Sequence, residues 1–290
     1  MGVGGRWPGD DHGWEATDAP RLKPLSYPGR WPTESILLTR DARYDLQLQP
    51  AQGLGRARIV LGDEALPLDD ALIRQSSPRA EVRTPVLAVG SNAAPSQLRF
   101  KFDRAGVSTV VPLVLAAVEG LAASYAAHLS AVGYIPATAV TGPGLSSRLF
   151  VQWLDADQLA AMDRSEPGYR RVLIPAGDPA LGGVRVTLPS GEVLGACYAY
   201  VETRGHLVTD SGAALQLTDQ RALLVGLLDR SRRLQSLMGT SAESWLDRAT
   251  DPGLRAAVDQ LFVDEGWAVH DAALTALAEE QAAPPCGVDA

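Results

Sequence analysis

The stretch Val86-Leu87-Ala88-Val89-Gly90-Ser91-Asn92 carries the main information about the fold. Its apolar residues predict a short buried strand that ends in a tight turn at Gly90. A glycine followed by small polar residues can direct successive backbone N–H groups into one concavity that binds a carboxylate. Gly90, Ser91 and Asn92 are therefore candidate anion-binding residues. The alternative is a plain strand-to-helix turn in which Ser91 or Asn92 caps the next segment.

A second segment, Met162-Asp163-Arg164-Ser165-Glu166, ends 75 residues beyond Ser91. The residues before it have helical spacing, and Pro167-Gly168 predicts the end of that helix, with a strand starting at Tyr169. Glu166 is thus predicted at a helix C-terminus, where a carboxylate is suited to accept a proton near neutral pH. The alternative is a solvent-facing Glu166 that pairs with one of the following arginines.

The remaining hydrophobic pattern places most strands before most helices. Short or alternating apolar runs predict strands at 44–48, 57–61, 84–89, 110–121, 136–140, 149–154, 169–174, 184–188 and 195–201. Helices are predicted at 157–163 after an Asp155 cap, at 218–238 after Thr218, from Pro252 onward after Asp251, and at 272–281. Strands in the middle and helices at the end favour an α+β fold over alternating βαβ units.

Taken together, the two segments resemble the γ-glutamylcyclotransferase-like superfamily. Val89-Gly90-Ser91-Asn92 is similar to the family signature Y-G-S-N, and residues 162–166 are similar to its L-D-x-x-E, which ends in the catalytic glutamate. Further family strands resemble residues 136–140, 149–154, 169–171 and 196–200, so the resemblance covers roughly residues 84–205. Two positions depart from the pattern. The family tyrosine is Val89 here, and the usual Glu-Gly is replaced by Glu166-Pro167-Gly168.

The resemblance implies a small mixed β-barrel with flanking helices, followed by a C-terminal helical segment. It also implies a cyclotransferase, in which the α-amino group of a γ-glutamyl amine or peptide attacks its own γ-carbonyl and releases 5-oxoproline and a free amine. Glu166 would be the catalytic general acid and base. The substrate would be bound by the turn and the later strand, at Val89, Gly90, Ser91, Asn92 and Tyr169. No metal, cofactor or covalent intermediate is needed.

Two alternatives remain open at this point. One is an inactive module of the same family that binds a small acidic ligand or a protein partner. The other is a serine hydrolase, in which Ser91 on its turn after a strand would use His128 or His206 as a base. The sequence Val89-Gly90-Ser91-Asn92-Ala93 lacks the second glycine of a G-x-S-x-G elbow, which argues against the hydrolase.

Composition divides the chain into five predicted segments. Residues 1–33, rich in Gly, Pro, Asp and Trp, predict an irregular N-terminal arm. Residues 34–83 predict a short strand-containing extension that ends in a polar linker at 74–83. Residues 84–205 carry the family resemblance, residues 206–281 predict a helical region packed on that domain, and residues 282–290 predict a frayed tail.

The formal charge of −8 excludes some classes of function. Residues 241–290 hold ten acids and two bases, which account for all of it, and no basic block suggests nucleic-acid binding. Residues 84–205 carry about as many bases as acids, so an anionic substrate has to be attracted locally. Two cysteines, Cys197 and Cys286, do not make a disulfide framework or a zinc site. The pattern shows no signal peptide or membrane span, so we expect a cytoplasmic protein with a small-molecule γ-glutamyl substrate.

Overall fold

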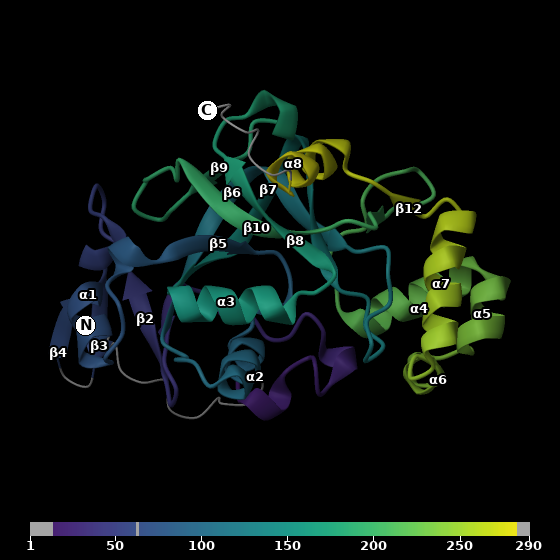
Figure 1. Ribbon diagram of the computed structural model, residues 1–290, viewed down its shortest axis with the longest axis horizontal. Coiled ribbons are helices and arrows are strands. Elements are labelled where there is room, and N and C mark those ends of the chain that lie inside the picture. The colour runs from purple at the N-terminus through teal and green to yellow at the C-terminus, as the bar shows by residue number, and fades with distance from the viewer. Residues whose placement is uncertain (1–13, 62–63, 283–290) are drawn as a thin grey trace, which may run out of the picture.

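The computed structural model describes residues 14–61 and 64–282 of the chain. Within them, ten strands form one large mixed sheet, and eight α-helices cover it or pack beside it (Figure 1). This is an α+β fold, as the sequence predicts. Residues 1–13 of the predicted arm, residues 283–290 of the predicted tail, and Cys286 lie outside the described residues.

The strand β5 (Thr84–Ala88), which leads into the predicted turn, lies near the middle of this sheet. It is antiparallel to β7 (Ala137–Leu154) on one side and parallel to β10 (Ala196–Glu202) on the other. β8 (Tyr169–Pro175) pairs antiparallel with β10, so that Tyr169 lies opposite Glu202. The C-terminal ends of β5 and β10 and the start of β8 therefore lie side by side at the same end of their strands.

The predicted small β-barrel is wrong in one respect, because the sheet is not closed. The strand order is β4-β3-β2-β1-β6-β7-β5-β10-β8, with β9 (Arg185–Thr187) paired to β6 (Val111–Tyr125). β1 (Ile36–Leu38) occupies the edge of β6, and the sheet continues through β2 (Arg43–Gln47), β3 (Arg58–Leu61) and β4 (Glu64–Pro67). That edge is therefore not available to β8. These four strands precede the region of family resemblance.

β6 and β7 form one long hairpin, where the sequence predicts separate strands at 136–140 and 149–154. β7 is continuous because both halves pair with the same strand, with Val140 opposite Ala122 and Phe150 opposite Leu115. The register shifts between these pairs, next to Gly120, whose φ is +74°. The residues between the two predicted strands thus contain a bulge within the hairpin, as extra residues in one strand of a pair produce.

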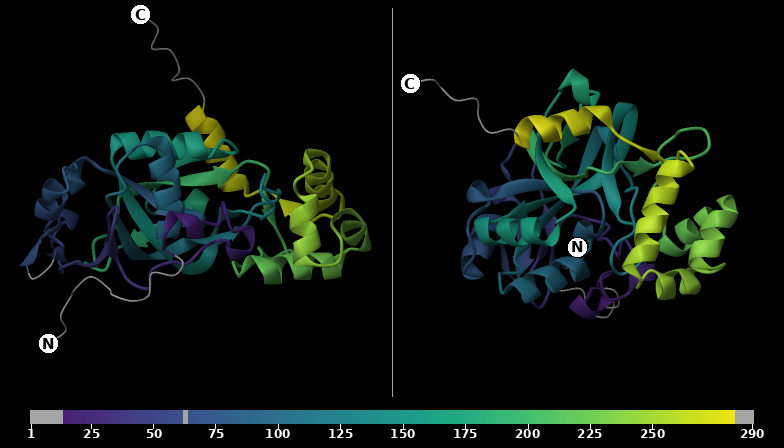
Figure 2. Two further views of the ribbon diagram at one scale, coloured as in Figure 1. Left: turned by 90° about the horizontal axis from the view of Figure 1, so that it is seen from below. Right: turned by 45° about the vertical axis from the view of Figure 1, so that its right-hand side comes forward.

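Helices cover both faces of the centre of the sheet. α2 (Pro95–Ala105) and α3 (Ala156–Ser165) contact each other and pack against one face through a shared apolar core (Val86, Ala88, Leu98, Phe102, Phe150, Met162). α8 (Ala272–Ala282) packs on the other face through Leu274 and Ala278 (Figure 2). α3 confirms the predicted helix and its Asp155 cap, whereas α2 was not predicted.

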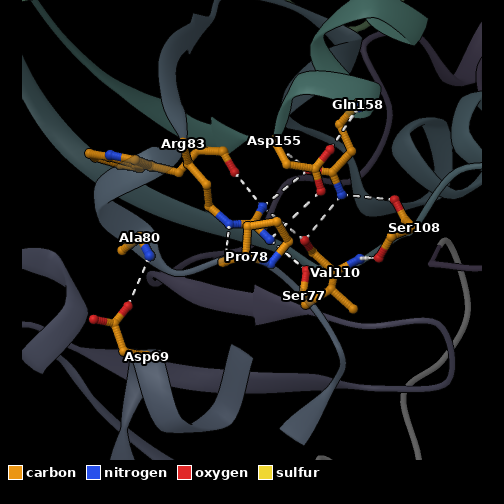
Figure 3. Close-up of polar contacts among 10 residues, drawn as sticks. Asp69, Ser77, Pro78, Ala80, Arg83, Ser108, Val110, Asp155 and Gln158 are labelled. Atoms are coloured by element: carbon orange, nitrogen blue, oxygen red, sulfur yellow. Dashed lines mark hydrogen bonds and ion pairs between the residues drawn. The ribbon is translucent and has the colours of Figure 1, made fainter. Parts of the chain in front are cut away.

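Residues 74–83 were predicted as a polar linker. They begin at the last residue of helix α1 (Leu68–Arg74) and end at Arg83, whose buried side chain makes several hydrogen bonds (Figure 3). The Arg83 side chain is 0% exposed and donates hydrogen bonds of 2.9–3.2 Å to three backbone oxygens, those of Pro78, Val110 and Trp153. It also donates to Gln158 Oε1 (3.1 Å) and lies 3.8 Å from Asp155. Burial lowers the pKa of Arg83, and Asp155 acts in the opposite direction. Arg83 therefore fixes the N-terminal end of α3.

The C-terminal helices form a second core beside the sheet. Where the sequence predicts one helix at 218–238, the structure has α4 (Gln220–Arg230) and α5 (Arg232–Met238). Ser231 separates them, because its hydroxyl accepts a hydrogen bond from the N–H of Leu234 (3.2 Å) and caps α5. α6 (Ala242–Arg248) and α7 (Pro252–Asp264) complete the group around the fully buried Trp245, and α7 confirms the predicted start at Pro252. No helix within the described residues has the length and apolar character to span a membrane.

Candidate active site

A cleft of about 680 Å³ opens at the end of the sheet where β5 and β10 end and β8 begins. Its walls come from the turn after β5, from α2 and α3, from residues 128–136 between β6 and β7 with the first residue of β7, and from the N-terminal segment. The structure brings all the predicted site residues to this cleft: Val89, Gly90, Ser91, Asn92, Glu166 and Tyr169. Their roles in binding and catalysis stay predictions.

The turn after β5 is packed so closely that it requires a glycine. A Cβ atom at Gly90 would meet the Tyr27 hydroxyl at 2.5 Å and the Cβ of Ala137 at 2.8 Å. Ser91–Ala93 then form a 3₁₀ turn, in which the N–H of Ala93 donates to the oxygen of Gly90 (3.0 Å). The N–H groups of Ser91 and Asn92 precede this bond, as the first N–H groups of any helix do. They are the candidate donors of the predicted anion nest, and the Ser91 N–H also interacts with the Tyr27 hydroxyl.

Glu166 follows the last turn of α3 and lines the cleft. α3 begins with a capping box, in which Asp155 accepts from the N–H of Gln158 (2.9 Å) and Gln158 accepts from the N–H of Asp155 (3.0 Å). At the other end, the Glu166 carboxylate accepts a hydrogen bond from the side-chain amide of Asn92 (2.9 Å) and pairs with the Lys101 ammonium. Lys101 also donates to Asn92 Oδ1 (2.7 Å). The three side chains hold one another in a fixed arrangement.

Three tyrosines, Tyr27, Tyr134 and Tyr169, also line the cleft. The rings of Tyr27 and Tyr134 stack with centroids 4.5 Å apart. The Tyr27 hydroxyl accepts from the N–H of Ala137 (2.5 Å), and the Tyr169 hydroxyl donates to the Ala137 oxygen (2.8 Å). Burial raises the pKa of Tyr27 and Tyr169 well above the ordinary value and that of Tyr134 to about 12, and the charge of Glu166 adds to each shift. All three therefore remain neutral hydroxyls at pH 7.

A second carboxylate, that of Glu202 at the end of β10, lies behind the cleft wall. Its side chain is 0% exposed and accepts hydrogen bonds from Arg204 Nε (2.8 Å) and Nη2 (3.1 Å). Glu202 Oε2 also lies 3.0 Å from Nδ1 of His128. Burial alone would raise the pKa of Glu202, but His128 and Arg204 outweigh it and lower the pKa to about 2. Glu202 is therefore ionised at neutral pH, and its two partners line the cleft.

Positive charge dominates the described lining of the cleft. The ionisable lining side chains other than tyrosine and histidine are one carboxylate, Glu166, and five cations, namely Arg21, Lys101, Arg104, Arg164 and Arg204. Such a lining attracts an anionic ligand. Within residues 14–61 and 64–282, no group of three or more His, Cys, Asp or Glu side chains is arranged to hold a metal ion.

The geometry bears on three predictions from the sequence. Asn92 lines the cleft and its side chain contacts Glu166 and Lys101, while its role in substrate binding stays a prediction. Glu166 does not pair with a following arginine, because Arg171 instead binds Asp163 (2.9 Å). As for the serine hydrolase, His206 does not line the cleft and so is not placed to act as a base for Ser91. His128 does line it, with its Nδ1 at Glu202, and what argues against this alternative is the missing second glycine of the nucleophile elbow.

Lys101 and Tyr27 line the cleft but were not predicted as site residues from the sequence. Lys101 lies on α2, whose apolar residues Leu98, Phe100 and Phe102 alternate as in a strand and hide the helical period. Pro95 in the first turn and Gly106 after the last one are helix boundary signals that would have found α2. Tyr27 belongs to the irregular N-terminal segment, where no local pattern indicates a contact with Gly90.

Comparison with known proteins finds no family model and no curated protein that matches the chain. Similar solved structures include a protein from Arabidopsis thaliana (16% identity, TM-score 0.33), covering 54% of this chain and 89% of its own. An uncharacterized human protein has 18% identity and a TM-score of 0.33, with 42% and 68% covered. A γ-glutamyl cyclotransferase has 12% identity and a TM-score of 0.34, with 61% and 98% covered. Scores at this level carry no argument about activity, so the proposal below depends on residues and geometry.

Proposed function

We propose that the protein is a cyclotransferase that acts on γ-glutamyl amines or peptides and releases 5-oxoproline and a free amine. The observation that supports the proposal is the shared cleft. Asn92 in the turn and Glu166 lie 74 residues apart in the sequence, yet the Asn92 amide donates a hydrogen bond of 2.9 Å to the Glu166 carboxylate. A glutamate that faced bulk solvent away from the turn would have argued against catalysis.

In the proposed reaction, the backbone N–H groups of Ser91 and Asn92 hold the α-carboxylate of the substrate. Glu166 takes a proton from the α-ammonium group, and the resulting neutral amine attacks the γ-carbonyl to close a five-membered ring. The same carboxyl group hands a proton to the departing amine. Holding the substrate curled supplies much of the rate, since well-oriented intramolecular reactions reach effective molarities of about 10⁵ M or more. Lys101 and Asn92 keep the carboxylate in one orientation for this purpose.

The position of Tyr27 also supports an active site. The family tyrosine before the glycine is Val89 here, and Val89 is a buried apolar residue of the core. Tyr27 approaches from the N-terminal segment and brings a hydroxyl to within 2.5 Å of where a Cβ of Gly90 would lie. An aromatic hydroxyl is therefore present beside the turn, although it comes from a different part of the chain.

A second candidate function is a non-catalytic module that binds a small acidic ligand. The observation that favours it is the pairing of Glu166 with Lys101 in a cleft lined by five cations. Under this hypothesis Glu166 positions Lys101, and the cleft binds an anion without converting it into a product.

One substrate panel separates the two candidates. Purified protein is incubated with γ-glutamyl amines and γ-glutamyl peptides, and 5-oxoproline is quantified by chromatography, alongside Glu166→Gln and the control Glu119→Gln. Glu119 is a matched glutamate, 68% exposed and outside the cleft lining. We expect release by the wild type and the control and loss in Glu166→Gln. Calorimetric binding of 5-oxoproline without any turnover would favour the non-catalytic module and contradict the enzyme.

A further inference from the structure

The imidazole of His128 is a second ionisable group in the cleft, and the proposed reaction gives it no task. His128 is 7% exposed and lines the cleft from the segment between β6 and β7. Its Nδ1 lies 3.0 Å from Glu202 Oε2 and forms no hydrogen bond elsewhere in the described part of the chain. Since Nδ1 faces Glu202, Nε2 is the nitrogen available to a molecule in the cleft.

Hydrogen bonds from Arg204 hold the Glu202 carboxylate beside the His128 imidazole. It accepts hydrogen bonds from the Arg204 guanidinium and from the Arg204 backbone N–H (3.0 Å), so its carboxylate has a fixed place behind the imidazole. A buried, ionised carboxylate at one imidazole nitrogen orients the ring and stabilises the charge that it carries during proton transfer. His128 and Glu202 therefore form an oriented acid–base pair.

The segment that carries His128 is anchored to the C-terminal helices. Asp259 of α7 accepts a hydrogen bond from the N–H of Leu129 (2.7 Å), and the indole N–H of Trp245 on α6 donates to the oxygen of Gly133 (3.0 Å). On the same segment, the Ser130 hydroxyl lines the cleft and is buried without a hydrogen-bond partner among the described residues. This segment is thus held at two points, and it offers a polar atom that a ligand can satisfy.

His128 and Glu166 are neighbours of one tyrosine but belong to different walls. The Tyr169 ring lies 6.1 Å from the His128 ring, and the charges of both Glu202 and Glu166 contribute to the raised pKa of Tyr169. Glu166 comes from α3, beside the anion-binding turn, whereas His128 comes from the segment between β6 and β7. A substrate with its α-amino end at Glu166 can therefore present its other end to His128.

We infer that His128 is a second catalytic residue, which takes over from Glu166 the protonation of the leaving amine. The inference depends on the proposed cyclotransferase function. As the α-nitrogen bonds to the γ-carbon, the bond between that carbon and the leaving nitrogen breaks, and this nitrogen takes a proton from Nε2 of the His128 imidazolium.

The protons balance over one turnover. The α-ammonium group gives one proton to Glu166 and a second to water, and it keeps the third as the lactam N–H. His128 regains its proton from water, and the proton on Glu166 converts the released amine into its ammonium form. Proton donation to the leaving group is thereby separated from activation of the nucleophile, and no oxidant, metal or cofactor takes part.

The experiment compares two substrates whose leaving groups differ in basicity. γ-Glutamyl-p-nitroanilide releases a weakly basic amine that departs without prior protonation, and a γ-glutamyl alkylamide releases a strongly basic one that requires it. Initial rates of 5-oxoproline release are measured for the wild type, His128→Gln, Glu166→Gln and the control His270→Gln. His270 is exposed and does not line the cleft.

We expect His128→Gln to lose about 100-fold or more on the alkylamide and about threefold or less on the anilide, as removal of a general acid does. Glu166→Gln loses both activities, and His270→Gln keeps both. The ratio of the two rates does not depend on the fraction of folded enzyme, so it stays informative if His128→Gln is destabilised. An equal loss on both substrates, or no loss, overturns the role of His128 and leaves the cyclotransferase intact. A wild type inactive on both overturns the proposed function and this inference with it.

Discussion

The two ends of helix α3 carry similar groups in different settings. At the N-terminal end, the Asp155 carboxylate lies beside Arg83 and Gln158. At the C-terminal end, the Glu166 carboxylate lies beside Lys101 and Asn92. The exposed fractions of the two acidic side chains are close, 12% for Asp155 and 16% for Glu166. Burial therefore does not distinguish the two ends.

The two ends of α3 differ in whether their charged side chains line a cavity. Arg83 donates to three backbone oxygens and two side chains, so every side of its guanidinium is enclosed by protein (Figure 3). Glu166, Lys101 and Asn92 instead line a cleft of about 680 Å³. An ion pair with enclosed partners stabilises the fold, whereas one that faces a cavity has atoms available for a ligand. The experiments below test this difference, from the largest expected effect to the smallest.

Arg83→Met tests the enclosed end. Removing the cation takes one donor from each of three backbone oxygens and leaves Asp155 without its cationic partner. Breaking a buried pair on one side costs about 3–5 kcal/mol of unfolding free energy. Urea denaturation measures this loss. Arg79→Met is the control, because Arg79 is 53% exposed and its pair with Asp69 spans 3.9 Å, so we expect a change of about 0.5 kcal/mol or less. A loss below about 1 kcal/mol for Arg83→Met would contradict the structural role.

The pH dependence of stability tests a third carboxylate, Glu202, which is enclosed like Asp155 but has partners in the cleft. Its pKa is about 2 in the folded protein against an ordinary value of 4.5. A depressed pKa adds stability above pH 4.5, and this contribution is lost as the pH falls from about 4.5 to about 2. The difference corresponds to about 3 kcal/mol. Denaturation at pH 2 to 5 should therefore show a shallower pH dependence for Glu202→Gln than for the wild type. Parallel curves would show that His128 and Arg204 do not stabilise the ionised form.

Gly90→Ala tests the packing of the turn. The added Cβ would lie 2.5 Å from the Tyr27 hydroxyl, and overpacking of this kind costs about 1–3 kcal/mol. Tyr27→Phe removes the hydroxyl, so the double variant should be less destabilised than the sum of the two single variants. Additive losses would mean that Tyr27 does not limit the space at Gly90.

Lys101→Met tests the open end and should have the smallest effect on stability. The Lys101 and Glu166 side chains are 9% and 16% exposed. Because both line the cleft, where water can replace a lost partner, we expect a loss of about 1 kcal/mol, below the cost of breaking an enclosed pair. Release of 5-oxoproline should fall about tenfold, since each 1.4 kcal/mol of lost positioning is a factor of ten. A stability loss as large as that of Arg83→Met would remove the distinction between the two ends.

The parts of the site that could be predicted from the sequence are those that depend on local patterns. Asp155 is followed three residues later by Gln158, a capping pair, and Gly90-Ser91-Asn92 follows a short apolar run. Such features form from neighbouring residues, so their position along the chain is enough to find them. The helix α3, the strand β5 and the end of α3 at Glu166 belong to this group.

The parts that could not be predicted depend on contacts between distant segments. Arg83 is in a polar stretch whose charge suggests solvent, and only the fold shows that Val110 and Trp153 enclose it. Tyr27 reaches Ala137, 110 residues away, from a segment with no regular period. The open sheet also follows from such a contact, because β1, which lies outside the region that carries the family motifs, pairs with β6 inside it.

The most direct test of the account compares the two ends of α3 in one assay. Release of 5-oxoproline from a γ-glutamyl substrate is measured for the wild type, Glu166→Gln and Asp155→Asn, each corrected for its folded fraction by denaturation. We expect Glu166→Gln to lose about 10²–10⁴-fold, the usual contribution of a general acid–base residue. Asp155→Asn, which keeps a good N-cap, should retain activity within about threefold. Equal activity in the two variants, or wild-type rates in Glu166→Gln, would contradict the assignment of catalysis to the open end of the helix.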